Sequence, residues 1–133
     1  MIKNSLIWNS LIISMALIVG CDSWNVEIVV KQSINNLSSD TIVVVDSGNE
    51  FRGISVKNTI TCFPFSETLF FDAVLNKQPL EPYDMPYISQ NATVYTSSKR
   101  ILTKNIHDEK NWRFNKTRKQ EYLKFTINEE DLE

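Results

Sequence analysis

The stretch Thr41-Ile42-Val43-Val44-Val45, followed by Asp46-Ser47-Gly48-Asn49, decides the fold class. Its first five residues are all β-branched, which is typical of a buried β-strand. The four residues that follow have hairpin-turn chemistry, because Gly48 and Asn49 tolerate positive φ angles. The stretch therefore predicts a strand that ends in a tight turn.

The chain on either side shows the same kind of pattern. Apolar and polar residues alternate with a period of two over 26–31, 54–63 and 122–127, which indicates strands with one buried face. Further strands are predicted over 69–75, 92–96, 100–104 and 112–115, with a turn-rich break over 35–40. Pro79, Pro82 and Pro86 exclude a central strand between them. Asn128 with the acidic residues 129–131 predicts a capped helical turn at the end of the chain.

Seven or eight short strands without helical periodicity predict an all-β domain. We expect a single domain over residues 26–133, built as an antiparallel, immunoglobulin-like β-sandwich or as a small barrel. A stretch of this length is long enough for one domain with its own hydrophobic core.

The first twenty residues differ from the rest of the chain. Lys3 is the only charged residue before Asp22, and an apolar stretch runs from Leu6 to Val19. This stretch is interrupted by polar residues and is shorter than the roughly 20 apolar residues that a membrane-spanning helix needs. A basic start, an apolar middle and a small residue at the end predict a cleaved secretion signal over residues 1–20.

The end of this segment is more specific. Ile18-Val19-Gly20-Cys21 resembles the lipobox of bacterial lipoproteins. The resemblance implies cleavage after Gly20 and attachment of acyl chains, such as palmitate, to Cys21. Two or more acyl chains give stable membrane anchoring. Residues 21–25 then form a lipidated tether, and the domain lies outside the cytoplasm in the cell envelope, on either the inner or the outer membrane.

If Cys21 carries lipid, Cys62 is the only other thiol in the chain. This excludes an internal disulfide and a cysteine-based zinc site. Cys62 also lies on an alternating strand, where cysteine is typically a small buried hydrophobe rather than a nucleophile. We predict no metal and no cofactor.

The other catalytic candidates are weak. His107 lies beside Asp108 in a polar stretch that indicates an exposed loop. Ser55 lacks the second glycine of a nucleophile elbow. The proline-rich segment holds Glu81 and Asp84, whose paired carboxylates with neighbouring aromatics are compatible with glycosidase chemistry or sugar binding. A surface loop explains the same residues without chemistry.

The proline-rich segment also supplies a possible binding edge, formed by Tyr83 and Tyr87. Charge suggests a second surface, because residues 99–124 contain nine basic and three acidic side chains. Within this segment Lys116, Arg118 and Lys119 form a possible patch for anionic headgroups, acidic glycans or an acidic partner. The alternative is a solvated face whose charges protect sheet edges from pairing. A protein outside the cytoplasm is not expected to meet nucleic acid.

The layout as a whole resembles the small lipoproteins of the Bacteroidota group. The resemblance rests on the short tether, on the segment 35–42 and on the ending 121–132, which contains Glu121-Tyr122-Leu123-Lys124-Phe125-Thr126-Ile127. It implies a β-sandwich and no particular activity. We therefore expect a lipid-anchored, non-enzymatic binding or assembly module with an envelope protein or glycan as its partner. The alternative is an envelope enzyme that acts on glycan or peptide through Glu81 and Asp84.

Overall fold

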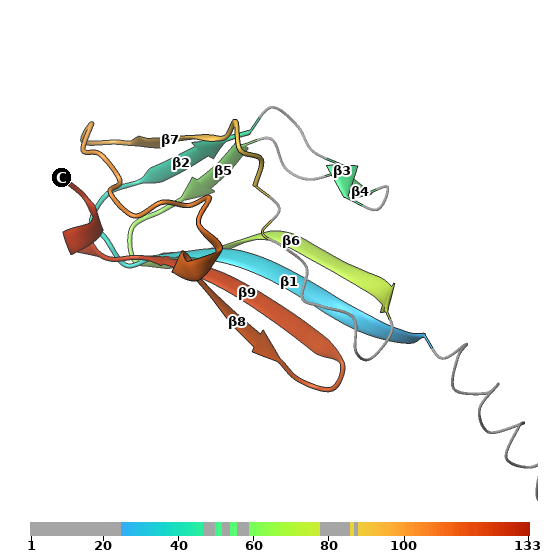
Figure 1. The fold of residues 1–133 in the computed structure, drawn as a ribbon. Helices are drawn as coiled ribbons and strands as arrows, with labels where there is room; N and C mark the ends of the chain where they lie inside the picture. The colour runs from blue at the N-terminus through green and yellow to red at the C-terminus, as the bar shows by residue number, and fades with distance from the viewer. Residues whose placement is uncertain (1–24, 47–49, 52–53, 56–58, 78–85, 87) are drawn as a thin grey trace, which may run out of the picture.

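The computed structural model describes residues 25–46, 50–51, 54–55, 59–77, 86 and 88–133. Within these ranges the secondary structure consists of β-strands and two single 3₁₀ turns, η1 and η2, which confirms the predicted all-β class (Figure 1). The elements are β1 (Val26–Asn36), β2 (Ile42–Val45), β3 (Glu50–Phe51), β4 (Ile54–Ser55), β5 (Thr59–Cys62), β6 (Ser66–Lys77), β7 (Thr93–Thr96), η1 (Glu109–Asn111), β8 (Trp112–Lys116), β9 (Gln120–Ile127) and η2 (Glu129–Asp131).

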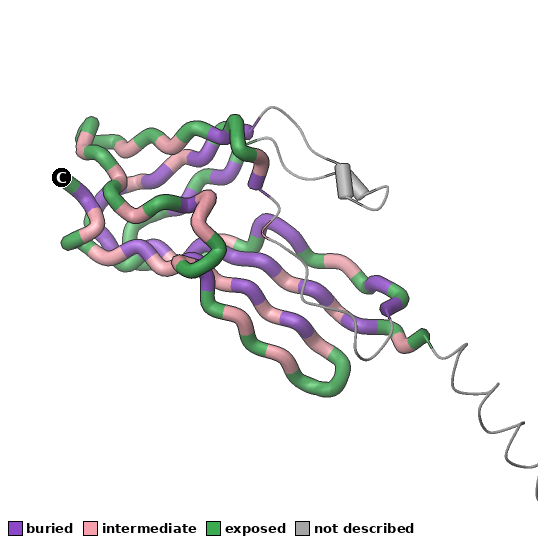
Figure 2. The backbone as a smooth tube through the Cα atoms, viewed as in Figure 1, coloured by how far each residue is buried: buried purple, intermediate pink, exposed green. Residues whose placement is uncertain are grey.

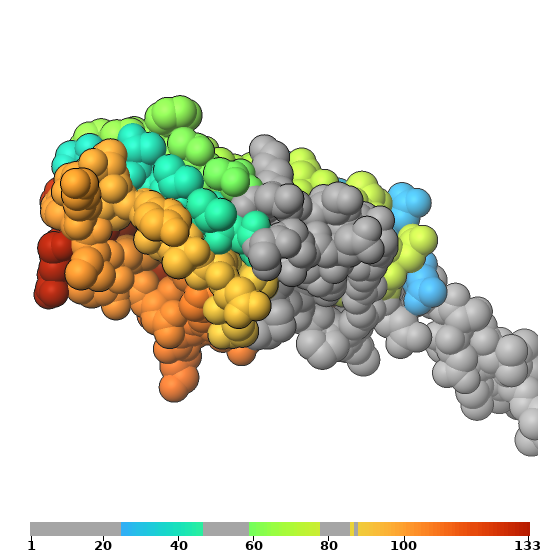
Figure 3. Space-filling view, turned by 90° about the horizontal axis from the view of Figure 1, so that it is seen from above, coloured from blue at the N-terminus to red at the C-terminus, as the bar shows by residue number. Residues whose placement is uncertain are grey.

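The longer strands form two open sheets. One has the order β6-β1-β9-β8 and the other the order β5-β2-β7, while β3 and β4 form a separate pair within the described residues. Figure 1 shows the three-stranded sheet as a layer over the four-stranded sheet. From above, β2 and β7 lie over the half that is farther from the start of β1 (Figure 3). The fold is therefore sandwich-like, and the sheets are not closed into a barrel.

One strand pair differs from the antiparallel expectation. β1 and β9 run parallel, with Val29 opposite Gln120 and Asn36 opposite Ile127. The other described pairs are antiparallel. A parallel neighbour requires a long connection, and here the chain passes through the second sheet between β1 and β9.

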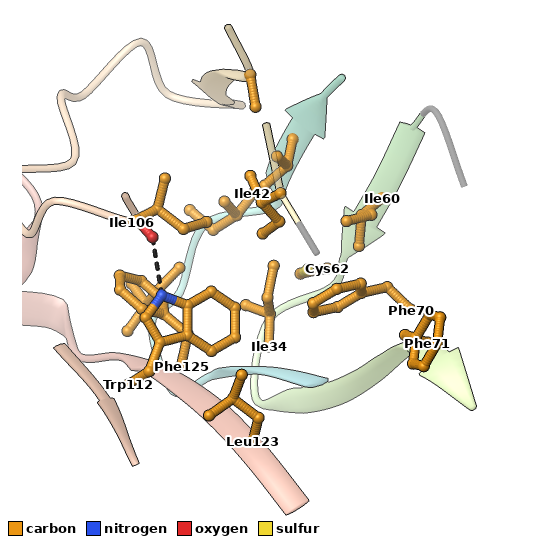
Figure 4. Packing of buried hydrophobic residues seen from close by; sticks show 14 of the residues in the cluster. Ile34, Ile42, Ile60, Cys62, Phe70, Phe71, Ile106, Trp112, Leu123 and Phe125 are labelled. Atoms are coloured by element: carbon orange, nitrogen blue, oxygen red, sulfur yellow. Dashed lines mark hydrogen bonds between the residues drawn. The ribbon is translucent and has the colours of Figure 1, made fainter. Parts of the chain in front are cut away.

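The core lies between the two sheets (Figure 4). Ile34 and Phe125 from the four-stranded sheet are fully buried together with Ile42 and Cys62 from the three-stranded sheet. Trp112 packs near Phe125, with 5.2 Å between the ring centroids. Burial of each large apolar side chain contributes about 1.5–3 kcal/mol to stability, so this cluster is the main force that joins the layers.

Burial alternates along β9, as the sequence predicts (Figure 2). Leu123, Phe125 and Ile127 face the core, while Tyr122 and Lys124 are half-buried on the opposite face. The predicted strands over 69–75, 92–96 and 112–115 correspond to β6, β7 and β8. The predicted terminal turn is η2, where the backbone N–H of Asn128 donates to the Asp131 carboxylate over 2.8 Å.

The predicted strand over 100–104 is wrong. This segment instead pairs with the end of the chain: Ile101 exchanges two backbone hydrogen bonds with Glu133, and Leu102 forms an isolated bridge with Leu132. Because its partner is this short terminal segment, the pairing does not extend into a sheet. The predicted strand over 54–63 corresponds to β4 and β5, with residues 56–58 between them outside the described ranges.

The predicted break over 35–40 begins later than expected, because β1 continues to Asn36. The buried Asn36 amide donates to the carbonyls of Asp40, Cys62 and Phe63 over 2.7, 3.1 and 3.2 Å. Its side-chain oxygen accepts a hydrogen bond from the Ser38 hydroxyl over 2.7 Å. This side chain therefore fixes the β1–β2 and β5–β6 connections against each other at one end of the domain.

Candidate functional site

The start of β1 and the β8–β9 hairpin lie at the same end of the four-stranded sheet (Figure 1). The Thr117 N–H donates to the Gln120 carbonyl over 2.8 Å, which closes the hairpin turn around Arg118 and Lys119. The N–H of Val29, the fourth residue of β1, donates to the Lys119 carbonyl over 2.9 Å. The turn is therefore fixed beside the point where the chain enters the domain.

A hollow of about 750 Å³ opens at this end of the molecule. We call it the N-terminal groove. It is lined by Val26, Glu27, Ile28, Val29, Val74, Lys116, Thr117, Arg118 and Lys119. Val74 lies opposite Val29 in the β1–β6 register, and its side chain is 59% exposed. The groove thus combines an apolar floor with a basic rim.

The three basic residues of the predicted patch lie together on this rim. Arg118 and Lys119 are exposed, and Lys116 is partly exposed with its Nζ 3.6 Å from Glu121 Oε1. Glu27, also exposed, is the acidic residue that lines the groove. Among the lining residues that the structure describes, three are thus cationic and one is a carboxylate. This arrangement can bind an anionic, partly apolar ligand.

A buried ion pair lies behind the rim. Glu121, at the start of β9, accepts two hydrogen bonds from Lys77 Nζ, at the end of β6, over 2.9 and 3.0 Å. Both side chains are buried. Glu121 therefore contacts two cations, Lys77 and Lys116, and its side chain is buried inside the domain rather than exposed on the rim.

A second polar cluster lies at the opposite end of the domain, around the buried Asp40. The Asp40 carboxylate accepts hydrogen bonds from the hydroxyls of Ser98 and Ser97 and from Arg100 Nε. These contacts, led by the Ser98 hydrogen bond, lower the pKa of Asp40. Arg100 also pairs with Glu129 over 2.6 Å. The cluster ties the β1–β2 connection to the segment after β7 and to η2, which is a structural role.

A shallower hollow of about 450 Å³ lies between β7 and the segment 99–107. Tyr95 and Ile101 line it and are 57% and 71% exposed. His107 also lines it and is half-buried, and the segment around it is a loop with exposed residues, as the polar stretch predicts. Its Nδ1 is buried without a hydrogen-bond partner in the described part of the chain. Within that part of the chain, Nδ1 therefore lacks the hydrogen bond to a carboxylate that orients a general base.

Cys62 is fully buried on β5, as its place in the alternation predicts. Burial raises the pKa of its thiol to about 11. The thiol is therefore protonated at neutral pH, and a protonated thiol is a poor nucleophile. This chemistry agrees with the predicted structural role of Cys62.

The basic segment 99–124 does not form one surface. Lys99, Arg100 and Lys104 line the hollow beside β7. A third hollow, on the outer face of the four-stranded sheet, is lined by Lys104 as well as by Lys110, Arg113 and Lys124. The hairpin residues of the predicted patch are a separate group beside β1.

Several predicted site residues lie outside the described residues: Gly20, Cys21, Glu81, Tyr83, Asp84 and Tyr87. They stay predictions. Two features have no counterpart among the sequence predictions: the apolar floor of the N-terminal groove and the buried Lys77–Glu121 pair. The alternation in 26–31 could have indicated the apolar floor, because it places the apolar Val29 on the face that points away from the core.

Comparisons with known protein families, with curated proteins and with solved structures give no match. No helix within the described ranges is long and apolar enough to cross a membrane. In the same part of the chain, no three His, Cys, Asp or Glu side chains gather as ligands for a metal ion.

Proposed function

We propose that this chain is a lipid-anchored protein of the bacterial cell envelope, whose β domain binds a partner rather than catalysing a reaction. The observation that carries the proposal is the lipobox Ile18-Val19-Gly20-Cys21, followed by a β-strand that begins at Val26. Acyl chains on Cys21 would hold the domain at a membrane surface outside the cytoplasm.

The short tether supports this arrangement. Val26 is five residues after Cys21, a distance of at most about 17 Å in a fully extended chain. A folded domain attached so closely stays beside the bilayer surface. Partners that it can reach are envelope proteins, envelope glycans and the lipid headgroups themselves.

The described polar residues support binding over catalysis. The Cys62 thiol is protonated, because its pKa is raised to about 11. The Asp40 carboxylate is held by serine hydroxyls and Arg100, and the Glu121 carboxylate is held by Lys77 and Lys116. Each of these groups has a structural explanation. The alternative, an enzyme that uses Glu81 and Asp84, rests on residues outside the described ranges.

Metabolic labelling with an alkyne fatty acid in a bacterial host tests the anchor. We expect the full-length chain to take up the label and to float with membranes, and Cys21→Ala to lose both properties. Cys62→Ala is the matched control, because it removes the other thiol and should keep the label. Label on Cys21→Ala, or none on the wild type, would contradict the proposal.

A further inference from the structure

We infer that the N-terminal groove docks the domain onto anionic phospholipid headgroups of the membrane that holds the acyl chains of Cys21. The inference rests on the proposed function and deepens it, because it assigns a ligand to one surface of the domain. It predicts a fixed orientation, with the β8–β9 hairpin toward the bilayer and the β5–β6 connection away from it.

The position of the groove is the first argument. Val26 both begins β1 and lines the groove, so the groove opens where the tether would leave the domain. Five residues reach at most about 17 Å, and charges in physiological salt interact over about 8 Å. A short tether therefore allows the hairpin to come within the range at which its charges act.

The composition of the groove is the second argument. Anionic headgroups attract lysine and arginine, while apolar side chains insert at the boundary between headgroups and acyl chains. The groove offers both, with Arg118 and Lys119 on its rim and Val29 and Val74 on its floor. An acidic glycan would use the cations but not the exposed Val74. The combination favours lipid.

The third argument is that the rim is preorganised. The hydrogen bonds Thr117 N–H to Gln120 O and Val29 N–H to Lys119 O hold the turn before any ligand arrives. Little conformational entropy is then lost on docking. Glu121 pairs with the buried Lys77 and lies 3.6 Å from Lys116 Nζ, so the fully exposed charges of the rim are those of Arg118 and Lys119.

Hydrogen–deuterium exchange in lipid nanodiscs tests docking. The full chain from a bacterial membrane is placed in discs of phosphatidylcholine alone or with one-third phosphatidylglycerol, and exchange is followed in peptides that cover 112–120. We expect slower exchange in the anionic discs at 0.05 M salt and no difference at 0.5 M, where screening is stronger. The intact mass of the Cys21 peptide, measured on the same sample, reports acylation separately. If Cys21 is not acylated, the proposed function is contradicted. If Cys21 is acylated but exchange in the β8–β9 hairpin is not slowed by anionic lipid, docking is contradicted.

Variants make the test specific. One lysine or arginine near an anionic leaflet strengthens binding about fivefold, so loss of the exposed Arg118 and Lys119 charges should weaken docking about 25-fold. K116Q/R118Q/K119Q should weaken docking at least as much and abolish the protection. The matched control K99Q/K110Q/R113Q removes the same amount of charge from exposed positions elsewhere. The hairpin of this variant should still be protected from exchange. Glu27→Gln should strengthen docking.

Three outcomes would overturn the inference. The first is equal exchange of the wild type in both kinds of disc. The second is equal loss of protection in the two triple variants, which would indicate an effect of net charge. The third is protection of the hairpin by soluble alginate on neutral discs but not by anionic lipid, which would assign the groove to an acidic glycan.

Discussion

Lys77 and Glu121 form an ion pair inside the domain, with Lys77 Nζ 2.9 Å from Glu121 Oε1 and both side chains nearly inaccessible, at 0% and 3% exposure. The pair joins the end of β6 to the start of β9 across β1. Each charge loses several kcal/mol of hydration on burial, and the attraction between the two charges offsets part of this loss. The pair thus links the ends of two strands that β1 separates, behind the N-terminal groove.

The first prediction concerns this pair. Glu121→Leu removes the carboxylate that accepts two hydrogen bonds from the buried Lys77 Nζ, and should lower the free energy of unfolding by about 3–5 kcal/mol. The double variant K77M/E121L should recover most of this loss, because it removes both charges. Urea denaturation measures both values. Glu130→Leu, at an exposed position, is the control and should change stability by less than about 0.5 kcal/mol. Equal stability of the single and double variants would contradict the prediction.

The second prediction concerns pH. The pKa of Asp40 in the folded protein is lowered below its ordinary value of 3.8, mainly by the Ser98 hydrogen bond and further by Ser97 and Arg100. A lowered pKa adds stability above the pKa of the unfolded chain, and that stability is lost as the pH falls through the folded value. The wild-type melting temperature should therefore fall more steeply below about pH 4 than that of Asp40→Asn.

Two serine variants test the cause of this pH dependence. Ser98→Ala should reduce the fall in melting temperature below about pH 4 more than Ser97→Ala does. The reason is that the Ser98 hydrogen bond makes the larger contribution to lowering the pKa of Asp40. Thermal melts between pH 7 and pH 3 measure the slopes. If the melting temperature of Asp40→Asn falls as steeply at low pH as that of the wild type, other carboxylates cause the pH dependence.

Local sequence predicts the strands whose burial is one-sided. Alternation indicated β1 and β9, and the β-branched run 41–45 indicated β2, because in each strand one face meets the core. The segment 100–104 looked similar but pairs with residues 131–133. A pairing between segments so distant in the sequence depends on the tertiary fold, which local patterns do not contain.

For the candidate site too, local sequence predicted which residues group together but not where the fold places them. The sequence indicated Lys116, Arg118 and Lys119 as one basic group, and they do lie on one hairpin. Their position beside the start of β1 depends on the parallel register of β1 and β9, which the sequence did not predict. Burial of Lys77 could not be predicted either, because a lysine at a strand end ordinarily lies in solvent. Its partner is 44 residues away.

The third prediction concerns Cys62. Its thiol is fully buried with a pKa of about 11, so a thiol reagent should not modify it in the folded protein at pH 7–8. We expect negligible labelling by Ellman's reagent until urea unfolds the domain, and then labelling that follows the unfolding transition. Rapid labelling under native conditions would mean that local unfolding of β5, which exposes Cys62, requires little free energy.

The last prediction concerns the backbone between β5 and β6. Phe65 has a φ of 53°, and its side chain is 70% exposed. A left-handed conformation costs a residue with a Cβ about 1–2 kcal/mol, and glycine avoids this cost. The same change makes the unfolded chain more flexible, at a cost of about 0.4–1 kcal/mol. Because the exposed ring contributes little to the core, Phe65→Gly should raise the free energy of unfolding by roughly 0.5–1 kcal/mol net in urea.

Phe63 provides the matched control two residues earlier. It is 63% exposed but is not among the positive-φ residues, so Phe63→Gly relieves no strain. It should instead lower stability by about 0.4–1 kcal/mol, because glycine makes the unfolded chain more flexible. Opposite signs for the two variants would establish that the turn is strained at Phe65. If both variants lose stability equally, the Phe65 ring makes contacts that outweigh its backbone conformation.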